Sequence, residues 1–350
     1  MASTALTFNL YRVLRQQLLD TIDPAILNSS ITPQQLQQWH LFAKYLIQAS
    51  SHVKGRYDFA YIDRTGAMPS VLNVAYSKIP PFNESFQHRS FLDVSIDRAQ
   101  ELLSRDKTIC VMWSGGVDST LALASLVAQA RHRDQIEILC SWESICEAGS
   151  LFDSVIKPWN LQIRFDQTRL NTTNPYTGDC GHELYVSGAC GDQLFGPSNI
   201  RPWQPKPPFD DTWDHGYSQS FLDIVGPSVK LSPRPINTKR DIAWWMFFNF
   251  AWCTTRTDNQ IMRPVTTANR CLSFFDSWDF QQWAVSTNSY YDNAPGYRKA
   301  EIQALRSLID HDAYFVNKGK TNSVAWLQDP TWYIMDTEYR NYYTDDQTKQ

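Results

Sequence analysis

The chain has 350 residues, which suffice for one large domain or two modest ones with a hydrophobic core. Hydrophobic residues make up 43% and charged residues 19%, a composition typical of a soluble globular protein, and the aromatic content of 13% favours a well-packed core over a disordered chain. The formal net charge of −4 gives no general attraction to nucleic acid. The longest apolar run, residues 243–253, is too short to span a membrane, and the N-terminus lacks a secretory core. A cytoplasmic protein is therefore expected, with no membrane association.

The seven cysteines do not form a recognisable framework. No C-x-x-C pair occurs, so neither a zinc site nor a disulfide scaffold is indicated. Cys110 and Cys140 fall in apolar runs of strand length, where a buried thiol is expected. This usage fits a reducing compartment.

Residues 1–95 are predicted to form a separate α+β region of unknown role. Two helices and two short strands are expected there, at 8–19, 33–50, 57–62 and 71–76. Thr32-Pro33 supplies a cap and a first-turn proline for the second helix. The segment 78–84 contains Pro80-Pro81 and interrupts any regular pattern, and residues 96–104 then predict a short helix.

From Thr108 onward, strands alternate with helices. Strands are predicted at 108–113, 136–140, 161–165 and 183–186, with helices at 121–130 and 147–158. This alternation predicts an α/β fold: a doubly wound parallel sheet with helices on both faces and ligands at the carboxyl ends of its strands. The domain is expected to cover residues 96–330.

The second half of this domain is less regular. Residues 201–235 hold seven prolines and are predicted to be an irregular excursion. An apolar, buried helix is predicted at 240–254, and further helices at 280–285 and 297–310. The tail, 331–350, is rich in tyrosine and polar residues and is expected at the surface.

A glycine turn joins the first predicted strand of the sheet to its helix. The turn carries Ser114, two glycines, Asp118 and a Ser-Thr pair. Backbone N–H groups, hydroxyls and the positive end of a helix dipole would converge there, which predicts an anion site. Gly115 and Gly116 allow close approach of the anion, and Asp118 beside a phosphate is sensible if Mg²⁺ bridges the two.

The sequence S-G-G-V-D-S-T at 114–120 resembles the pyrophosphate-binding loop of the N-type ATP pyrophosphatase (PP-loop) superfamily. It differs from the Walker loop, whose pattern is absent. The resemblance implies an adenine nucleotide α-hydrolase-like fold and cleavage of ATP between its α and β phosphates. It also implies that the loop binds pyrophosphate through Ser114, Gly115, Gly116, Val117, Asp118, Ser119 and Thr120.

A second glycine turn, V-S-G-A-C-G-D-Q-L-F-G at 186–196, follows the strand at 183–186. It resembles the S-G-E-G-[AS]-D-E-L-F-G-G signature in the synthetase domain of the asparagine synthetase family. Lasso-peptide cyclases and β-lactam synthetases belong to the same branch of the superfamily. The two turns should converge on one edge of a parallel sheet. The resemblance then implies that Asp118 and Asp192 hold one Mg²⁺ ion and that Gly188 belongs to the ATP site.

Weaker similarities to the same family extend the resemblance over about residues 90–325. They lie at 262–264, 272–276, 296–299, 305–306 and 317–320. By this resemblance Lys299 steadies the charge of the transition state, although its spacing also leaves Lys318 or Lys320 as candidates. The segment of Leu139, Cys140 and Ser141, at the end of the second strand, would hold adenine.

Three departures from the family matter for the chemistry. Ala189 and Gln193 replace the two glutamates of the second signature, and the first of these is tied to amide formation. Ala2 stands where the glutaminase domain has its nucleophilic cysteine, so this chain is not expected to make ammonia from glutamine. Nitrogen would come from free ammonia, a separate donor protein or an amine substrate.

The resemblance implies an ATP-dependent, AMP-forming amide ligase that uses ATP and Mg²⁺ to adenylate a small-molecule or peptide carboxylate and transfers it to an amine or ammonia. Two alternatives stay open. One is a PP-loop enzyme that modifies a nucleobase or nucleic acid, a partner that the net charge does not indicate. The other is an impaired pseudoenzyme with a binding or structural role, which Ala189 and Gln193 keep open. A homo-oligomer is also left open.

Overall fold

The computed structural model describes residues 30–36, 38, 62–71, 77–165, 184–196, 211–217, 219–252, 271–287, 299–317, 333–335 and 342–344. The chain divides into two compact units whose segments interleave. The sheet unit comprises Ser90–Gly188, Arg263–Phe274 and Glu301–Gln350, and the helical unit comprises Met1–Arg89, Ala189–Met262 and Phe275–Ala300. The predicted division at residues 95 and 330 is consecutive rather than interleaved, and it stays a prediction.

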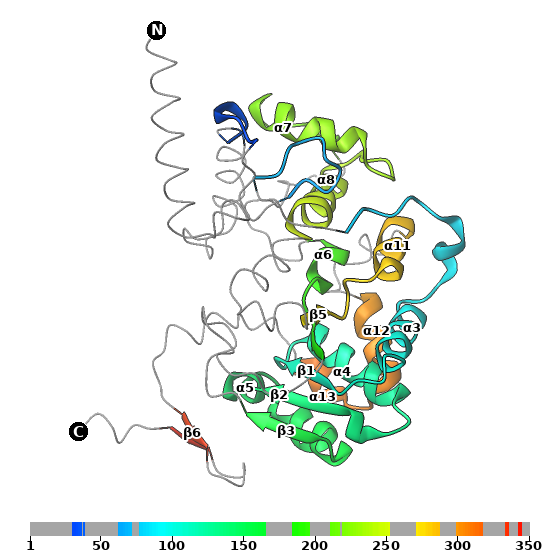
Figure 1. Ribbon diagram of the computed structural model, residues 1–350, viewed down its shortest axis with the longest axis vertical. Helices are drawn as coiled ribbons and strands as arrows, with labels where there is room; N and C mark the ends of the chain where they lie inside the picture. Colours follow the sequence, from blue (N-terminus) through cyan, green and yellow to red (C-terminus); the bar gives the residue numbers. More distant parts are fainter. Residues whose placement is uncertain are drawn as a thin grey trace, which may run out of the picture. The chain divides into compact units, whose positions relative to one another are not determined.

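The sheet unit contains a five-stranded parallel sheet of order β3-β2-β1-β4-β5, so the chain has an α/β fold (Figure 1). The strands are β1 Ile109–Trp113, β2 Ile136–Cys140, β3 Gln162–Phe165, β4 Leu184–Ser187 and β5 Cys271–Ser273. The first four confirm the predicted strands. The sequence analysis missed β5, whose three residues are too short to show a pattern.

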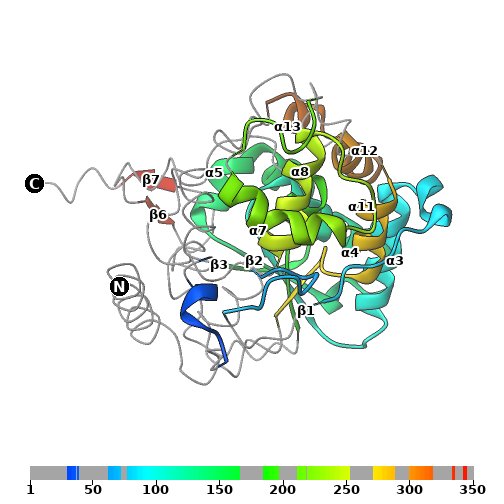
Figure 2. The ribbon, with the colours of Figure 1, turned by 90° about the horizontal axis from the view of Figure 1, so that it is seen from above.

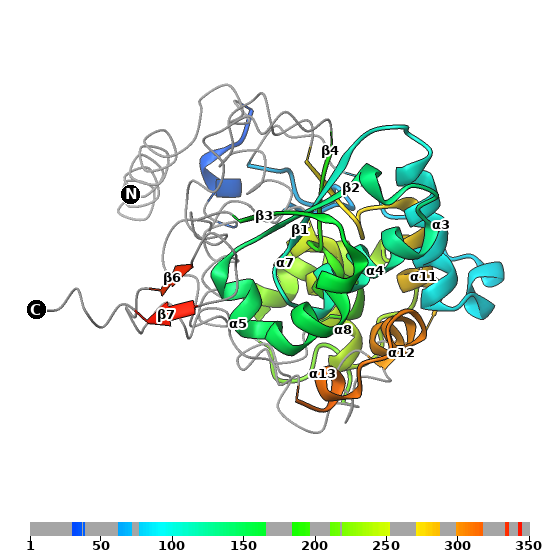
Figure 3. The ribbon, with the colours of Figure 1, turned by 90° about the horizontal axis from the view of Figure 1, so that it is seen from below.

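Two helices that pack together precede and follow β1. Helix α3, Phe91–Leu103, starts five residues before its predicted start, because Ser90 and Asp93 form a capping box. Helix α4, Val117–Gln129, is rich in leucine and alanine and is buried along nearly its whole length. The two helices lie side by side (Figures 1 and 3).

The helical segment after β2 is longer than predicted and changes its winding. Helix α5, Trp142–Leu151, begins at a capping box between Ser141 and Ser144. It continues as a π-helical turn, η4 Phe152–Ile156, and a 3₁₀ turn, η5 Lys157–Trp159. Asn160 ends the segment in the left-handed conformation (φ 56°).

The later part of the sheet unit adds helices and a strand pair. Helix α12, Lys299–Leu308, confirms the predicted helix at 297–310, and α13, Asp312–Asn317, follows it. Strands β6, Tyr333–Met335, and β7, Tyr342–Thr344, pair antiparallel within the predicted tail.

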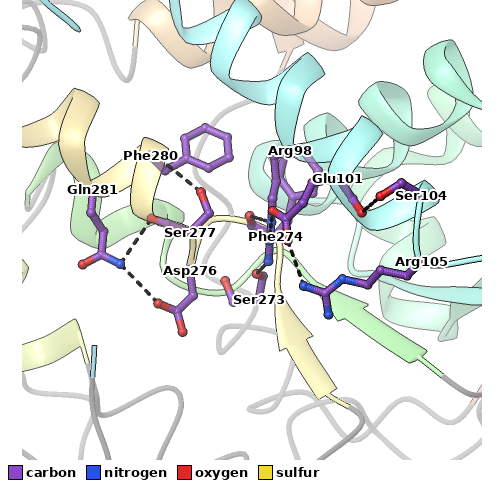
Figure 4. A network of polar contacts seen from close by, with 10 residues as sticks. All are labelled: Arg98, Glu101, Ser104, Arg105, Ser273, Phe274, Asp276, Ser277, Phe280 and Gln281. Atoms are coloured by element: carbon purple, nitrogen blue, oxygen red, sulfur yellow. Dashed lines mark hydrogen bonds and ion pairs between the residues drawn. The ribbon is translucent and has the colours of Figure 1, made fainter. Parts of the chain in front are cut away.

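Strand β5 is tied to α3 through one guanidinium (Figure 4). Arg98, which is 6% exposed, donates to the carbonyl oxygens of Phe274 (3.0 Å) and Ser273 (3.2 Å). It also forms an ion pair with Glu101 (2.5 Å), which Arg105 contacts from the solvent side (2.8 Å). A buried cation thereby satisfies the carbonyls at the end of the shortest strand of the sheet.

The helical unit is built from short helices. They are η2 Glu84–His88, α6 Gly191–Phe195, α7 Gln219–Lys230, α8 Lys239–Trp245 with its π-helical continuation η6 Met246–Ala251, and α11 Trp278–Ser286. Helices α7 and α8 lie side by side (Figures 1 and 2), and Trp245 Nε1 donates to Ser228 Oγ (3.2 Å).

Helix α7 corrects the prediction that 201–235 is an irregular excursion. Pro227 lies inside the helix, where a proline removes one backbone hydrogen bond. Phe221, Ile224 and Val225 are nevertheless buried along it. Burial of this apolar face outweighs the local cost of the proline. The number of prolines in the segment had predicted irregular structure instead.

The predicted apolar helix at 240–254 is confirmed as the core of the helical unit. Trp244 stacks on Phe248 with ring centroids 4.8 Å apart, and both are fully buried. The Arg64 guanidinium lies 5.1 Å from the centroid of Phe248 and 4.9 Å from that of Trp252, and it donates to Phe248 O (2.9 Å). The predicted helix at 280–285 is confirmed as α11.

Several N-terminal predictions lie outside the described residues. These are the helix at 8–19 and nearly all of the strands at 57–62 and 71–76; of the helix at 33–50, residues 33–36 are seen to be helical. Within the described part of the chain, no helix has the length and apolar character needed to cross a membrane.

Candidate functional site

The loop Ser114–Gly116 connects the carboxyl end of β1 to the first turn of α4. Its shape depends on Gly115, whose φ of +79° lies in the left-handed region. A Cβ at this position would lie 2.4 Å from the carbonyl oxygen of Ser144 in α5. Glycine is therefore required twice, by the backbone angle and by the close approach of α5.

One side of the loop is open. Ser114 is exposed, whereas Gly116 and Asp118 are half-buried. Gly116 is the N-cap of α4, and no side chain caps that helix, whose first turn contains Asp118. The open side therefore combines the positive end of a 13-residue helix with a hydroxyl and a carboxylate.

The other side of the loop faces the protein interior. Ser119 Oγ donates to Gly116 O (3.1 Å), accepts from Ser114 N–H (3.1 Å) and lies 3.0 Å from Ser114 Oγ. Thr120 is 1% exposed, and its hydroxyl accepts a hydrogen bond from Trp113 Nε1 (3.0 Å). Both hydroxyls support the loop from within, and their predicted contact with pyrophosphate stays a prediction.

The second glycine turn begins beside the first. Strands β1 and β4 are parallel neighbours, with Met112 opposite Ser187, so their carboxyl ends meet as predicted. A Cβ on Gly188 would lie 2.5 Å from Ser119 N, so the end of β4 packs against α4 backbone to backbone. Gly188 therefore has a packing role, and its role in ATP binding stays a prediction.

Asp192 lies in the first turn of α6 and is half-buried. The turn before α6 places Cys190 in the left-handed conformation (φ 69°). Asp192 belongs to the helical unit and Asp118 to the sheet unit. The magnesium site that they were predicted to share therefore stays a prediction.

The segment predicted to hold adenine is buried. Leu139 and Cys140 end β2, and Ser141 caps α5. Burial raises the pKa of the Cys140 thiol to about 12, so the thiol stays protonated. Lys299 is the first residue of α12, and its side chain lies outside what the structure describes.

Two side chains from distant parts of the sequence complete the surroundings of the loop. Tyr314 of α13 donates to Gly115 O (3.2 Å), and Glu147 of α5 lies beside Gly115 and Gly116. Burial raises the pKa of the Tyr314 phenol, opposed by a hydrogen bond with Thr120. From the sequence, Glu147 is equally a candidate contact to nucleotide or substrate and an ordinary helix-start carboxylate, and no local pattern marks Tyr314.

The surroundings of the loop are acidic. The negative charges of Glu147, Glu301 and Asp118 add to burial in raising the pKa of the Tyr314 phenol. Within the described ranges, no three His, Cys, Asp or Glu residues group closely enough to ligate a metal ion on their own.

The chain matches no protein-family model, and no curated protein or solved structure matches it at a significant level.

Proposed function

We propose that this chain is an ATP-dependent, AMP-forming ligase of the PP-loop type, which joins a carboxylate to an amine or ammonia. The observation that carries the proposal is the open side of the loop after β1. There the uncapped N-terminus of α4, the exposed Ser114 and the carboxylate of Asp118 lie together at the carboxyl end of a central parallel strand.

The strand order supports a doubly wound arrangement as part of this proposal. From β1 the chain moves through β2 to β3 on one side, whereas β4 and β5 lie on the other side of β1. The direction of winding therefore reverses between β1 and β4. Ligands of open α/β sheets bind outside the carboxyl ends of the strands at such a reversal, and both glycine turns begin there.

The charges of the site require a cation if a triphosphate is to bind. Asp118 on the open side of the loop and Glu147 beside Gly116 carry negative charge that would repel a bare triphosphate. Mg²⁺ typically takes one or two protein carboxylates and completes its octahedron with phosphate oxygens and water. Asp118, half-buried in the first turn of α4, fits the role of one such carboxylate and would hold the ion, which would neutralise charge on the leaving pyrophosphate.

The remaining roles follow from the resemblance and the loop. The α4 N-terminus and Ser114 would orient the β and γ phosphates while the carboxylate oxygen attacks the α phosphorus. Pyrophosphate leaves, and an acyl adenylate forms. The amine then attacks the acyl carbon, displaces AMP and loses one proton. Lys299 would steady the developing negative charge, and Leu139–Ser141 would hold adenine.

Exchange of labelled pyrophosphate into ATP tests this proposal. With Mg²⁺ and a panel of carboxylic acids, wild type should show exchange only with its own acid. Asp118→Asn should lower the exchange rate by at least about a hundredfold, since it removes a charge that steadies the transition state. Asp134→Asn, at an exposed position of the same unit, is the matched control and should keep the wild-type rate.

The same assay separates the alternatives. Exchange that depends on a nucleobase or nucleic acid would favour the modifying enzyme over the ligase. The absence of exchange with every substrate would favour the pseudoenzyme. An exchange rate that Asp118→Asn leaves unchanged would contradict both the ligase and the modifying enzyme.

A further inference from the structure

A contact from the C-terminal part of the sheet unit reaches the glycine loop. Tyr314 lies 194 residues after Thr120 in the sequence, yet its hydroxyl is 3.4 Å from Thr120 Oγ1 and 3.2 Å from the carbonyl oxygen of Gly115. Thr120 Oγ1 in turn accepts the indole N–H of Trp113 (3.0 Å). Because a hydroxyl can both donate and accept, these distances fit one chain from the indole through Thr120 and Tyr314 to Gly115 O.

We propose that Tyr314 is a positioning residue that holds the glycine loop in its anion-binding shape, an inference that rests on the proposed function. The reason is the planarity of the Gly115–Gly116 peptide. In a trans peptide the C=O and the N–H point in opposite directions. Tyr314 holds Gly115 O toward the interior and thereby keeps Gly116 N–H on the open side, where it meets Ser114 Oγ (3.4 Å).

Tyr314 itself is held firmly. Its backbone N–H donates to His311 Nδ1 (2.9 Å), and its ring packs edge-on against Phe315 with centroids 5.4 Å apart. The Arg306 guanidinium lies 4.9 Å from the Phe315 centroid, which ties α13 to α12. Helix α13 also packs against α5, the helix whose Ser144 and Glu147 lie beside Gly115.

The burial of Tyr314 favours a positioning role for its phenol over direct contact with a ligand. Tyr314 is 4% exposed, so its phenol does not reach a ligand on the open side of the loop. Burial and the nearby carboxylates of Glu147, Glu301 and Asp118 raise its pKa, so the phenol keeps its proton. A permanently protonated, buried phenol acts as a fixed donor and supports the peptide on which the ligand would rest.

Tyr314→Phe removes only the hydroxyl and is the first test. Tyr185→Phe is the matched control, because Tyr185 is also buried in the sheet unit but clusters with Cys110 and Leu139. In the protein without ligand, Tyr314→Phe should speed hydrogen exchange at the amides of 115–119 by roughly threefold to tenfold, as expected for one lost neutral hydrogen bond. Tyr185→Phe should leave that exchange unchanged.

Binding of inorganic pyrophosphate with Mg²⁺, and of Mg-ATP, measured by calorimetry, is the second test. Tyr314→Phe should weaken binding of both by roughly threefold to tenfold relative to Tyr185→Phe. Thr120→Val, a second variant that breaks the same chain, should weaken binding similarly. The double variant should lose little more binding affinity than the weaker-binding single variant, because both substitutions break the same chain of hydrogen bonds.

These outcomes separate the inference from the proposed function. Unchanged loop exchange in Tyr314→Phe, or additive losses in the double variant, would overturn the inference even if wild type binds Mg-ATP. Wild type that binds neither pyrophosphate nor Mg-ATP would overturn the proposed function and, with it, the role of Tyr314 in binding. Faster loop exchange together with coupled losses of binding supports both.

Discussion

Gly115 meets two independent demands on the backbone. Its positive φ would strain any other residue, and the Ser144 carbonyl leaves no room for a Cβ. Gly216 meets only the first, since its φ is +81° and nothing lies within 4 Å of an added Cβ. The two glycines therefore separate backbone strain from steric overlap.

Gly115→Ala should lower the free energy of unfolding by about 3 kcal/mol, from strain plus overlap. Gly216→Ala should cost only about 1 kcal/mol, from strain alone. Urea denaturation measures both. Equal losses would show that α5 shifts away from the loop without cost.

The hydroxyls of Ser119 and Thr120 differ in position from the other polar groups of the glycine loop. Exposed Ser114 and half-buried Asp118 lie on the open side, while Ser119 and Thr120 are buried and bonded inside. A sequence motif names all of these residues together. Only the fold places some of them on the open side of the loop and others in its interior.

At the scale of elements, Arg98 joins helix α3 to the end of β5. Its partner Glu101 has a lowered pKa: burial opposes ionisation, but the hydrogen bonds and charges of Arg105 and Arg98 outweigh it. The two arginines share one carboxylate yet differ in surroundings, because Arg98 is 6% exposed and Arg105 41%.

Arg98→Met should lower the free energy of unfolding by about 3 kcal/mol, because two backbone carbonyls lose their donor. Arg105→Met should change it by less than about 1 kcal/mol, as for other exposed ion pairs. Urea denaturation of the two variants gives the comparison. If both lost the same amount, the shared Glu101 rather than the carbonyls of β5 would account for the stability.

At the scale of the whole molecule, the buried Cys140 thiol links stability to pH. Its pKa rises from 9.0 to about 12 on folding. Above pH 9 the unfolded chain loses this proton while the folded chain keeps it. Stability is therefore fully present below the unfolded pKa and falls as pH rises toward the folded pKa.

Between pH 9 and about pH 10.5, wild type should lose stability more steeply than Cys140→Ala, by up to about 1.4 kcal/mol per pH unit. Urea midpoints across this range provide the measurement. An unaltered slope in Cys140→Ala would assign the pH dependence to other groups.

The sequence by itself determined four strands of the five-stranded sheet. Apolar runs at 108–113, 136–140, 161–165 and 183–186 became strands, because buried parallel strands need continuous hydrophobic segments that local composition reveals. The glycine turn between β1 and α4 was also readable, since its residues are adjacent in the chain. Helix α7 was not, because its buried apolar face outweighs Pro227 only once a partner covers it.

The tertiary structure alone decided which side of the loop is open and what supports it. Tyr314 reaches Gly115 and Thr120 across 194 residues or more, and Glu147 approaches from another helix. No local pattern encodes such contacts, because they depend on how elements distant in sequence pack. The sequence specified the turn; packing specified the direction in which its peptide groups point.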